Sequence, residues 1–453
     1  MNRDSLDFRN EQIGRLFRAL FIPTLIAMFF NSALNICDGM FVGHGVGSNA
    51  VAAINIVAPL FMLCTGIGLT FGIGASVIAS IRLSEDNIKA ARIIMTQAYI
   101  AGSIIFAVVI ALCLAFTKPV RYALGCSPAL EQYATDYLLW LLPGLVFFFL
   151  QCVGMMLIRL DGSPKYAMAV QIIAAILNIF LDWLMVFPMG MGIKGASVAT
   201  SISCMAGGIM VLAYFIFFSS KLKFYRLKTS RKSWKLSLRN VGYVIKIGFA
   251  TFVAELAFGV MMITGNYMFM GMLGEAGVAA FSVGCYLFPL MFSISNAVAQ
   301  SAQPIISFNY GAKAWGRVRS ALNLALSTAF VCGIFISLGM WLGAPALSSI
   351  FLTDPIAHAI ADRGLPLLGL CAAFFGINVA FIGYYQSTEQ SLRSIIYMLL
   401  RGIIFVVPAF IYLPRIIGEP GLWLAIPVAE AITLMIISAL YFSHCKTAKI
   451  SAK

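Results

Sequence analysis

Residues 41–53 read FVGHGVGSNAVAA, and residues 269–280 read FMGMLGEAGVAA, with Phe, Gly and a closing run of small residues in the same order. The stretch Gly192–Gly195 recurs in the same way at Gly418–Gly421. All these matches lie 226 to 228 residues apart, which is half of the chain. A repeat of this length in an apolar chain predicts two similar helical bundles, an architecture that allows rocking around a central site.

The composition around these stretches is that of a membrane protein. The chain has 453 residues, of which 61% are apolar and 11% charged, and its mean hydropathy is +0.94. Soluble proteins carry about 25% charged residues. Apolar runs long enough to cross a bilayer, about 20 residues each, follow one another along the chain. They are 15–41, 50–81, 92–117, 131–158, 164–187, 192–218, 242–271, 276–308, 317–341, 364–387, 391–413 and 420–443. We therefore predict an all-α polytopic membrane protein with twelve transmembrane helices in two pseudo-symmetric six-helix bundles.

The distribution of basic residues predicts the orientation. The net charge is +14, and assigning the loops alternately to two sides puts 24 of the 31 Lys and Arg residues on the side of both termini. By the positive-inside rule, that side is cytoplasmic. The basic excess is therefore a topology signal, with contact to anionic membrane lipids as a further use, and we expect no nucleic-acid partner.

A single long hydrophilic segment divides the chain. Ser219–Asn240 carries eight basic residues and no acidic one. We predict an N-terminal six-helix lobe at 1–218, a basic cytoplasmic linker at 219–240 and a C-terminal six-helix lobe at 241–453. Because each lobe has an even number of spans, both start on the same side and form parallel repeats.

Several kinds of chemistry are disfavoured by the sequence. It contains no HExxH, GxSxG, GxGD or Walker A motif, so we do not expect an enzyme. The ten cysteines are scattered without a CxxC pair and are typical of packing residues. We expect no cofactor and no metal beyond a possible coupling ion.

Two spans each carry a stripe of polar residues that ends in a carboxylate. The stripes are Asn31, Asn35 and Asp38 at i, i+4 and i+7 in the first span, and Gln171, Asn178 and Asp182 at i, i+7 and i+11 in the fifth. A charge within a bilayer costs at least ~2.5 kcal/mol, so buried acids are functional candidates. Two acids that lie close together in a low dielectric are not readily ionised at the same time, so at least one of them readily holds a proton. The oxygen atoms of these side chains, together with the Thr200 hydroxyl, are also ligands that suit a hard cation. The stripes thus predict a site for H⁺ or Na⁺. The alternative is a cluster of hydrogen bonds that only holds the two helices together. Two acids without a nearby base would stabilise such a contact poorly.

Comparison of the two repeats shows that the halves differ in their acidic residues. At the constant offset, Asp38 falls on Asn266 and Asp182 falls near Ala409. The acid pair therefore exists only in the first half, and we expect ion coupling to reside there.

The remaining buried charges leave alternatives open. Glu255 falls near Ala27 and lacks an acidic counterpart, so it binds a cationic substrate, provides a second proton site or pairs with Arg401. Arg401 and Glu430 lie on the last two spans, and we favour mutual neutralisation.

Helix-shaping residues complete the pattern. Gly66, Gly68, Gly72 and Gly74 in the second span predict close helix packing. Pro23 removes a backbone hydrogen bond within the first span and predicts a kink there.

These strings together resemble the MATE (multidrug and toxic compound extrusion) family, and its MepA-like bacterial branch most closely. The matching stretches are Asn35 to Gly43 with Ala50–Ala53, Asn178 to Asp182, Gly192 to Thr200, and Gln303 to Gly311. The resemblance covers essentially the whole chain in order and spacing.

The resemblance implies an antiporter that expels amphipathic, often cationic drugs in exchange for H⁺ or Na⁺. The family's N-lobe cation site would fall on Asp38, Asn178, Asp182 and Thr200, and Pro23 would match the proline where its first helix bends. Polar residues of the cavity, for substrate or cation, would be Asn31, Asn35, Gln171, Glu255 and Asn266. Glu255 matches an acidic position of the seventh span in the NorM-like branch.

The expected protein is a monomer in the cytoplasmic (inner) membrane of a bacterium, with small-molecule drugs or organic cations and membrane lipids as partners. The alternative is a lipid-linked oligosaccharide flippase of the related superfamily, which should need several cationic side chains to hold pyrophosphate. An intramembrane aspartyl protease is disfavoured by the missing GxGD motif and by the repeat.

Overall fold

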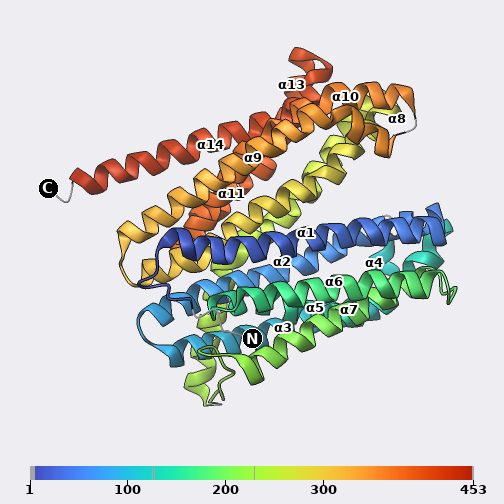
Figure 1. The fold of residues 1–453 in the computed structure, drawn as a ribbon. Helices are drawn as coiled ribbons and strands as arrows, with labels where there is room; N and C mark the ends of the chain where they lie inside the picture. The colour runs from blue at the N-terminus through green and yellow to red at the C-terminus, as the bar shows by residue number, and fades with distance from the viewer. Residues whose placement is uncertain (1–5, 125, 127, 229, 353, 451–453) are drawn as a thin grey trace. The chain divides into compact units, whose positions relative to one another are not determined.

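The computed structural model describes residues 6–124, 126, 128–228, 230–352 and 354–450, and the secondary-structure elements within them are all helices (Figure 1). The helices of the first half are α1 (Ile13–Gly45), α2 (Ser48–Ser84), α3 (Ile88–Ala115), α4 (Thr117–Ala123), the single turn η1 (Pro128–Leu130), α5 (Glu131–Leu160), α6 (Pro164–Val186), α7 (Ile193–Ala213) and the π-helical turn η2 (Tyr214–Phe218). The second half follows with α8 (Arg231–Gly311), α9 (Trp315–Phe351), α10 (Pro355–Gly369), α11 (Cys371–Ser387), α12 (Ser391–Leu399), the π-helical turn η3 (Leu400–Ile404), α13 (Val406–Ile417) and α14 (Glu419–Ile450). The predicted fold class is confirmed.

The predicted span boundaries agree with these helices, with one apparent exception. Eleven helical segments of the described chain are long and apolar enough to cross a membrane, where twelve spans were predicted. The difference arises at α8, which joins two predicted spans across a kink at Gly274, where φ is 65° and ψ is −155°. Only glycine adopts this conformation readily, so Gly274 is the turn between two membrane crossings.

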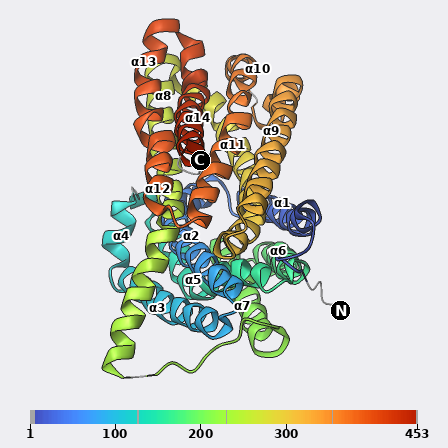
Figure 2. The same cartoon turned by 90° about the vertical axis from the view of Figure 1, so that its left-hand side faces the viewer.

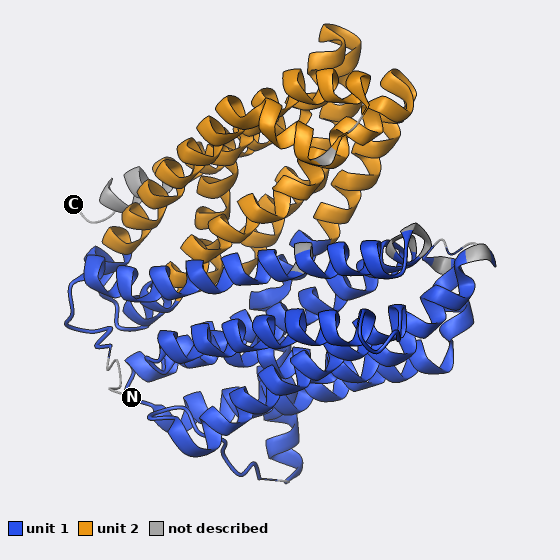
Figure 3. Ribbon diagram, turned by 45° about the vertical axis from the view of Figure 1, so that its right-hand side comes forward, with its two compact units in different colours: residues 1–255, 304–318 blue, residues 256–303, 319–453 orange. Residues whose placement is uncertain are grey.

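The chain forms two compact units (Figure 3). The first contains residues 1–255 and 304–318, and the second contains 256–303 and 319–453. This division follows packing, whereas the sequence-based lobes at 1–218 and 241–453 follow the repeat, and those lobes remain a prediction. The helix α8 contributes its first part and its last turns to the first unit and its middle to the second.

Glycines set the helix spacing in the first unit, where α1, α2, α3, α5, α6 and α7 run roughly parallel in Figure 1 and are seen more nearly along their axes in Figure 2. A Cβ on Gly72 of α2 would come within 3.1 Å of the Cys152 carbonyl oxygen of α5. A Cβ on Gly74 would collide with the backbone of Val244 in α8. The predicted close packing of the second span is therefore present and involves α5 on one face and α8 on another.

The repeat is visible in the backbone itself. In the described chain, the residues with positive φ form four pairs at the repeat offset: Gly47 and Gly274, Asp86 and Lys313, Gly162 and Glu389, and Gly192 and Gly418, with Gly190 outside the pairs. The first pair has φ of 108° and 65°, and the last pair has φ of 59° and 71° with ψ of −138° and −146°. The two halves thus turn in the same way at corresponding positions, even where the side chains differ.

The start of the linker is fixed by Asp161, a buried acid that the sequence analysis did not single out. Its carboxylate accepts hydrogen bonds from the Tyr214 hydroxyl at 2.7 Å and from the backbone N–H groups of Ser220, Lys221 and Leu222 at 2.8, 2.9 and 2.9 Å. One carboxylate therefore holds the first residues of the linker against the end of α5. Charge-assisted bonds of this kind are among the stronger ones in proteins.

The second unit has an aromatic core. Phe269 stacks on Phe281 with ring centroids 4.5 Å apart, and Trp423 meets Phe269 edge-on at 4.9 Å. Trp423 is fully buried and lies against Gly364 of α10, where a Cβ would collide with its ring. These contacts join α8, α10 and α14 within the unit.

The turn geometry predicts the effect of one substitution. Gly418→Ala places a Cβ where φ is positive, and although nothing lies within 4 Å of that Cβ, the backbone conformation should cost about 1–3 kcal/mol. We expect a lower melting temperature for the purified protein in detergent. Gly271→Ala, at a helical glycine with equally open surroundings, is the control and should leave the melting temperature nearly unchanged. Equal melting temperatures for both variants would contradict the assignment of strain to this turn.

Candidate functional site

The two acids predicted to form a site come together between α1 and α6, which pack along each other. Asp182 is fully buried and Asp38 is half-buried, and their carboxylates lie close enough to interact electrostatically. One oxygen of each, Oδ1, is buried without a hydrogen-bond partner in the described part of the chain. Neither acid forms an ion pair with a described Lys or Arg. The pair therefore has unused acceptor capacity in an enclosed place.

Asn178 connects this pair to α7. With its amide oriented to satisfy its neighbours, it donates to Asp182 Oδ2 at 3.1 Å and accepts from the backbone N–H of Thr200 at 3.2 Å. The Thr200 hydroxyl donates to the Ala196 carbonyl at 3.1 Å. Tyr137 of α5, which the sequence analysis missed, is buried within electrostatic range of both carboxylates. The four predicted cation-site residues thus converge, and a phenol joins them.

The first residues of the two polar stripes, Asn31 and Gln171, also meet. Gln171 Nε2 of α6 donates to Asn31 Oδ1 of α1 at 2.9 Å, and Gln151 Nε2 of α5 donates to Gln171 Oε1 at 3.2 Å. Gln151 was not predicted because it stands alone in an apolar span. Its side chain is buried, and its partner Gln171 is one of the residues that the stripe pattern identified. A polar chain therefore crosses three helices in the first unit.

The other predicted site residues lie elsewhere. Asn266 is an exposed residue of the second unit, and the side chain of Asn35 lies outside the described residues. Glu255, on α8, is half-buried in the first unit, with its Cγ 3.5 Å from where a Cβ on Gly66 would stand. Pro23 lies within α1, which continues as a helix through it to Gly45.

The second unit holds a buried ion pair. Arg401 Nη2 lies 2.6 Å from Glu430 Oε1, and Arg401 Nε donates to both carboxylate oxygens at 3.0 and 3.1 Å. Asn378 Nδ2 donates to Glu430 Oε2 at 2.7 Å, and the Arg401 guanidinium lies 4.0 Å from the centre of the Phe375 ring. Mutual neutralisation is confirmed, and the alternative pairing of Arg401 with Glu255 is not seen.

A Ser–His–Asp set lies where α9 ends and α10 begins. His358 Nε2 is 3.2 Å from Ser348 Oγ, and His358 Nδ1 is 3.1 Å from Asp362 Oδ2. The spacing is that of a hydrolytic triad, but Ser348 is fully buried and its hydroxyl donates to Asp362 Oδ1. A substrate cannot reach a nucleophile in that position, so the set connects two helices. Its residues lie on separate helices, and no local motif identifies them.

The acid pair is therefore the site with chemical capacity. Two carboxylates share a low-dielectric space without a compensating base, and this arrangement favours taking up a proton or a cation. In the described residues, no cluster of three His, Cys, Asp or Glu side chains offers a metal centre. The geometry suits the binding of a small cation rather than covalent catalysis.

Comparison with known proteins places this architecture in a family. The MatE family model matches the chain twice, over residues 23–184 and 250–411. The two matches are the two halves of the duplication. The chain belongs to the MatE family of membrane transporters, so it is a multi-pass transporter and not an enzyme.

Relatives extend over nearly the whole chain. A protein named FAD transporter from Shewanella oneidensis is 24% identical and covers 95% of this chain and 94% of its own length. The multidrug export protein MepA from Staphylococcus aureus is 21% identical over 94% of this chain and 92% of its own. A solved structure of a MOP superfamily transporter from Pyrococcus furiosus has a TM-score of 0.90 at 19% identity, covering 99% of each chain. This last likeness establishes the fold.

The buried ion pair yields a stability prediction. Arg401→Met leaves the Glu430 carboxylate unpaired, and Glu430→Gln leaves the guanidinium unpaired, so each should cost about 3–5 kcal/mol. The double variant should lose less than either single one, because no buried charge remains. The measurement is the melting temperature of the four proteins in detergent. Arg415→Met, at an exposed arginine of the same unit, is the control, and strictly additive losses would contradict mutual neutralisation.

Proposed function

We propose that this protein is a cation-coupled antiporter that exports amphipathic, often cationic compounds in exchange for H⁺ or Na⁺. The observation that carries the proposal is the Asp38–Asp182 pair, two enclosed acids without a basic partner among the described residues. A coupling ion that binds there relieves the repulsion between the carboxylates. The pair binds the ion, Asn178 orients Asp182, and Thr200 completes the site.

Of the two ions, H⁺ agrees better with the geometry. The Asn178 amide presents its nitrogen to Asp182, while its oxygen is occupied by the Thr200 N–H. A sodium ion is held by several oxygens, whereas a shared proton needs only the two carboxylates. We therefore propose proton coupling, with no organic cofactor.

Alternating access supplies the transport cycle in this proposal. Parallel repeats allow two bundles to rock around a central site, and ion binding at Asp38 alters the packing of α1 against α6. Pro23 is the proposed hinge in α1, because its missing N–H weakens the helix at that point. Asn31, Gln171 and Glu255 of the first unit offer polar contacts to the substrate or the cation in this proposal.

The expected substrates are cations because the described spans contribute uncompensated acids. Asp38, Asp182 and Glu255 have no basic partner in the described chain, whereas the Arg401 charge is compensated by Glu430. An anionic pyrophosphate substrate would find the opposite charge pattern, which disfavours the flippase alternative. The name of the MepA relative, a multidrug export protein, agrees with the export of drugs.

We propose that the protein acts as a monomer in the bacterial inner membrane, with both termini in the cytoplasm. The positive-inside rule supports this orientation, since 24 of 31 basic residues fall on the side of the termini. Membrane lipids are the expected neighbours, and nucleic acids are not expected partners.

The acid pair predicts a loss of export. Asp38→Asn and Asp182→Asn each remove a negative charge that binds the coupling ion, while they keep the shape of the side chain. We expect either substitution to lower drug resistance in an efflux-deficient host to the level of cells without the protein. The measurement is growth against graded ethidium, with protein abundance in the membrane compared by immunoblot.

Asp86→Asn provides the matched control, because this carboxylate is exposed and pairs only at the surface with Arg9. It should retain full resistance. Full resistance in both Asp38→Asn and Asp182→Asn at normal abundance would refute the ion-site assignment.

The coupling ion is predicted by the same geometry. In proteoliposomes loaded with ethidium, a pH gradient at equal Na⁺ should drive transport, and a Na⁺ gradient at equal pH should not. The Asp38→Asn variant should transport under neither. Transport under the Na⁺ gradient alone would contradict proton coupling, and transport under neither gradient by the wild-type protein would contradict antiport.

A flavin dinucleotide is the second candidate substrate, favoured by the name of the relative from Shewanella oneidensis. FAD is anionic, so the uncompensated acids argue against it. Loading the same proteoliposomes with FAD separates the two: gradient-driven movement of FAD but not of ethidium would replace the cationic substrate class.

A further inference from the structure

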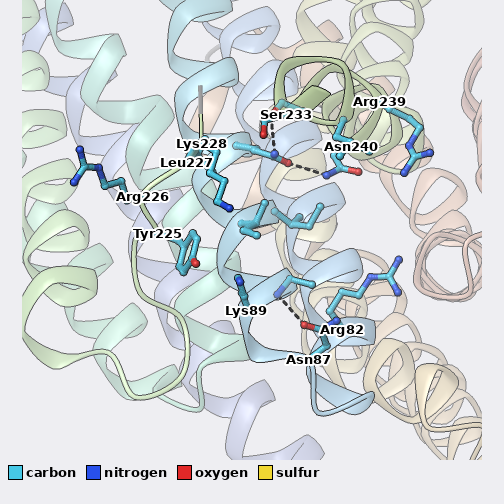
Figure 4. A pocket seen from close by; sticks show the side chains of 16 residues that line it. Arg82, Asn87, Lys89, Tyr225, Arg226, Leu227, Lys228, Ser233, Arg239 and Asn240 are labelled. Atoms are coloured by element: carbon cyan, nitrogen blue, oxygen red, sulfur yellow. Dashed lines mark hydrogen bonds between the residues drawn. The ribbon is translucent and has the colours of Figure 1, made fainter. Parts of the chain in front are cut away.

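A basic hollow of about 420 Å³ lies in the first unit, away from the acid pair, between the start of α3, the linker and the start of α8 (Figure 4). Figure 4 shows the ammonium groups of Lys89 and Lys228 pointing into it, while the Arg226 guanidinium points away. Arg82 and Arg239 stand at the rim. Nothing in the proposed export cycle uses this hollow.

Its charge is positive and only partly compensated. Arg82 is engaged by Glu85 at 2.8 Å. Lys89, Lys228 and Arg239 form no ion pair in the described part of the chain, and no acidic residue is among the lining residues. Lys89 instead lies 5.9 Å from the centre of the Tyr225 ring.

Two helix dipoles reinforce the positive potential. Asn87 caps the start of α3, accepting from the Ala90 N–H at 3.0 Å, and Ser230 caps the start of α8, accepting from the Ser233 N–H at 3.3 Å. Residues of both first turns line the hollow. The first turns of two long helices, where the helix dipole is positive, thus lie beside the same space as the lysines.

The walls of the hollow are held in place. The linker is fixed by the Tyr225 N–H donating to Thr96 Oγ1 of α3 at 2.9 Å. The buried Gln97 of α3 donates to the Ser237 hydroxyl at 2.8 Å and accepts from Asn240 Nδ2 at 3.0 Å. The linker and α8 are therefore bonded to α3 on both sides of the space, which gives the hollow a fixed shape.

Apolar side chains form the floor of the hollow beneath the lysines and arginines. Ile93, Ile94 and Leu236 line the hollow beneath the charged rim. The first turns of α8 also carry Trp234 and Leu238, which are 62% and 69% exposed, among basic residues. Exposed Trp and Leu interleaved with Lys and Arg are typical of a helix segment at the level of lipid headgroups. A ligand of this hollow would therefore meet positive charge and apolar surface together.

We propose that this hollow binds a phosphate ester, with an anionic phospholipid headgroup as the source that the apolar floor favours. The phosphate lies between Lys89 and Lys228, with the polar side chains of Asn87 and Ser233 beside it, and the adjoining glycerol backbone covers the isoleucines. Basic pockets on the cytoplasmic side of helical membrane proteins take phosphate headgroups by this chemistry. The inference uses the proposed cytoplasmic orientation of the basic side but does not depend on drug export.

The test measures lipid retention by the full-length purified protein. Native mass spectrometry follows binding of phosphatidylglycerol and, as a neutral-headgroup control, phosphatidylcholine with the same acyl chains. We expect a preference for phosphatidylglycerol, and we expect Lys89→Gln with Lys228→Gln to weaken its binding about tenfold or more. Lys223→Gln with Lys232→Gln removes the same charge from exposed linker and helix positions outside the hollow, and should change binding less than about threefold.

Glycerol 3-phosphate, added as a soluble competitor, distinguishes the sources. Retention of phosphatidylglycerol without displacement assigns the site to the lipid, whereas displacement that requires Lys89 and Lys228 shows that the phosphate ester alone is bound. Equal losses in the two double variants, or no preference over phosphatidylcholine together with no binding of glycerol 3-phosphate, would overturn the proposal. Because no transport is measured, failure here is distinct from failure of the export assignment.

Discussion

The structure depends on the cost of placing two carboxylates inside a bilayer without a base to neutralise them. Two other buried charges are compensated within the chain: Arg401 is paired with Glu430 and lies over the Phe375 ring, and Asp161 accepts from one hydroxyl and three backbone N–H groups. Among the described residues, neither Asp38 nor Asp182 has a basic partner, and Asp182 accepts only from the Asn178 amide. A mobile positive charge can compensate the pair, which makes the occupancy of the site dependent on the solution on either side of the membrane.

The surrounding polar residues limit how the acids can respond. Asn178 holds Asp182 to α7, while Gln171 holds α6 to Asn31 of α1 and to Gln151 of α5. Asp38 lies on α1, the helix that also contains Pro23. Asp182 therefore belongs to a helix that is bonded to three neighbouring helices, and Asp38 belongs to a helix with a weakened backbone. A change in charge at the pair is more easily accommodated by movement of α1 than of α6.

The sequence predicted the elements that follow from periodicity and repetition. Hydropathy located the spans, and the repeated stretches contain two of the four pairs of positive φ, Gly47 with Gly274 and Gly192 with Gly418. The stripes correctly brought Asn31 to Gln171, because helical spacing fixes which face a residue occupies. Residues that stand alone in apolar spans gave no such signal, so Tyr137 and Gln151 were missed. The Ser348, His358 and Asp362 set was missed because it forms only when two helices meet.

The π-helical turn at Leu400–Ile404 has a consequence for the register of the helix that contains Arg401. Such a turn holds one residue more than an α-helical turn, so the parts before and after it are out of phase by about 100°. Loss of one residue here would restore a regular helix and rotate one part relative to the other. The arginine would then leave its partner although every neighbouring side chain remained the same. The orientation of the Arg401 side chain towards Glu430 therefore depends on the one extra residue in this turn, and not only on which amino acids surround it.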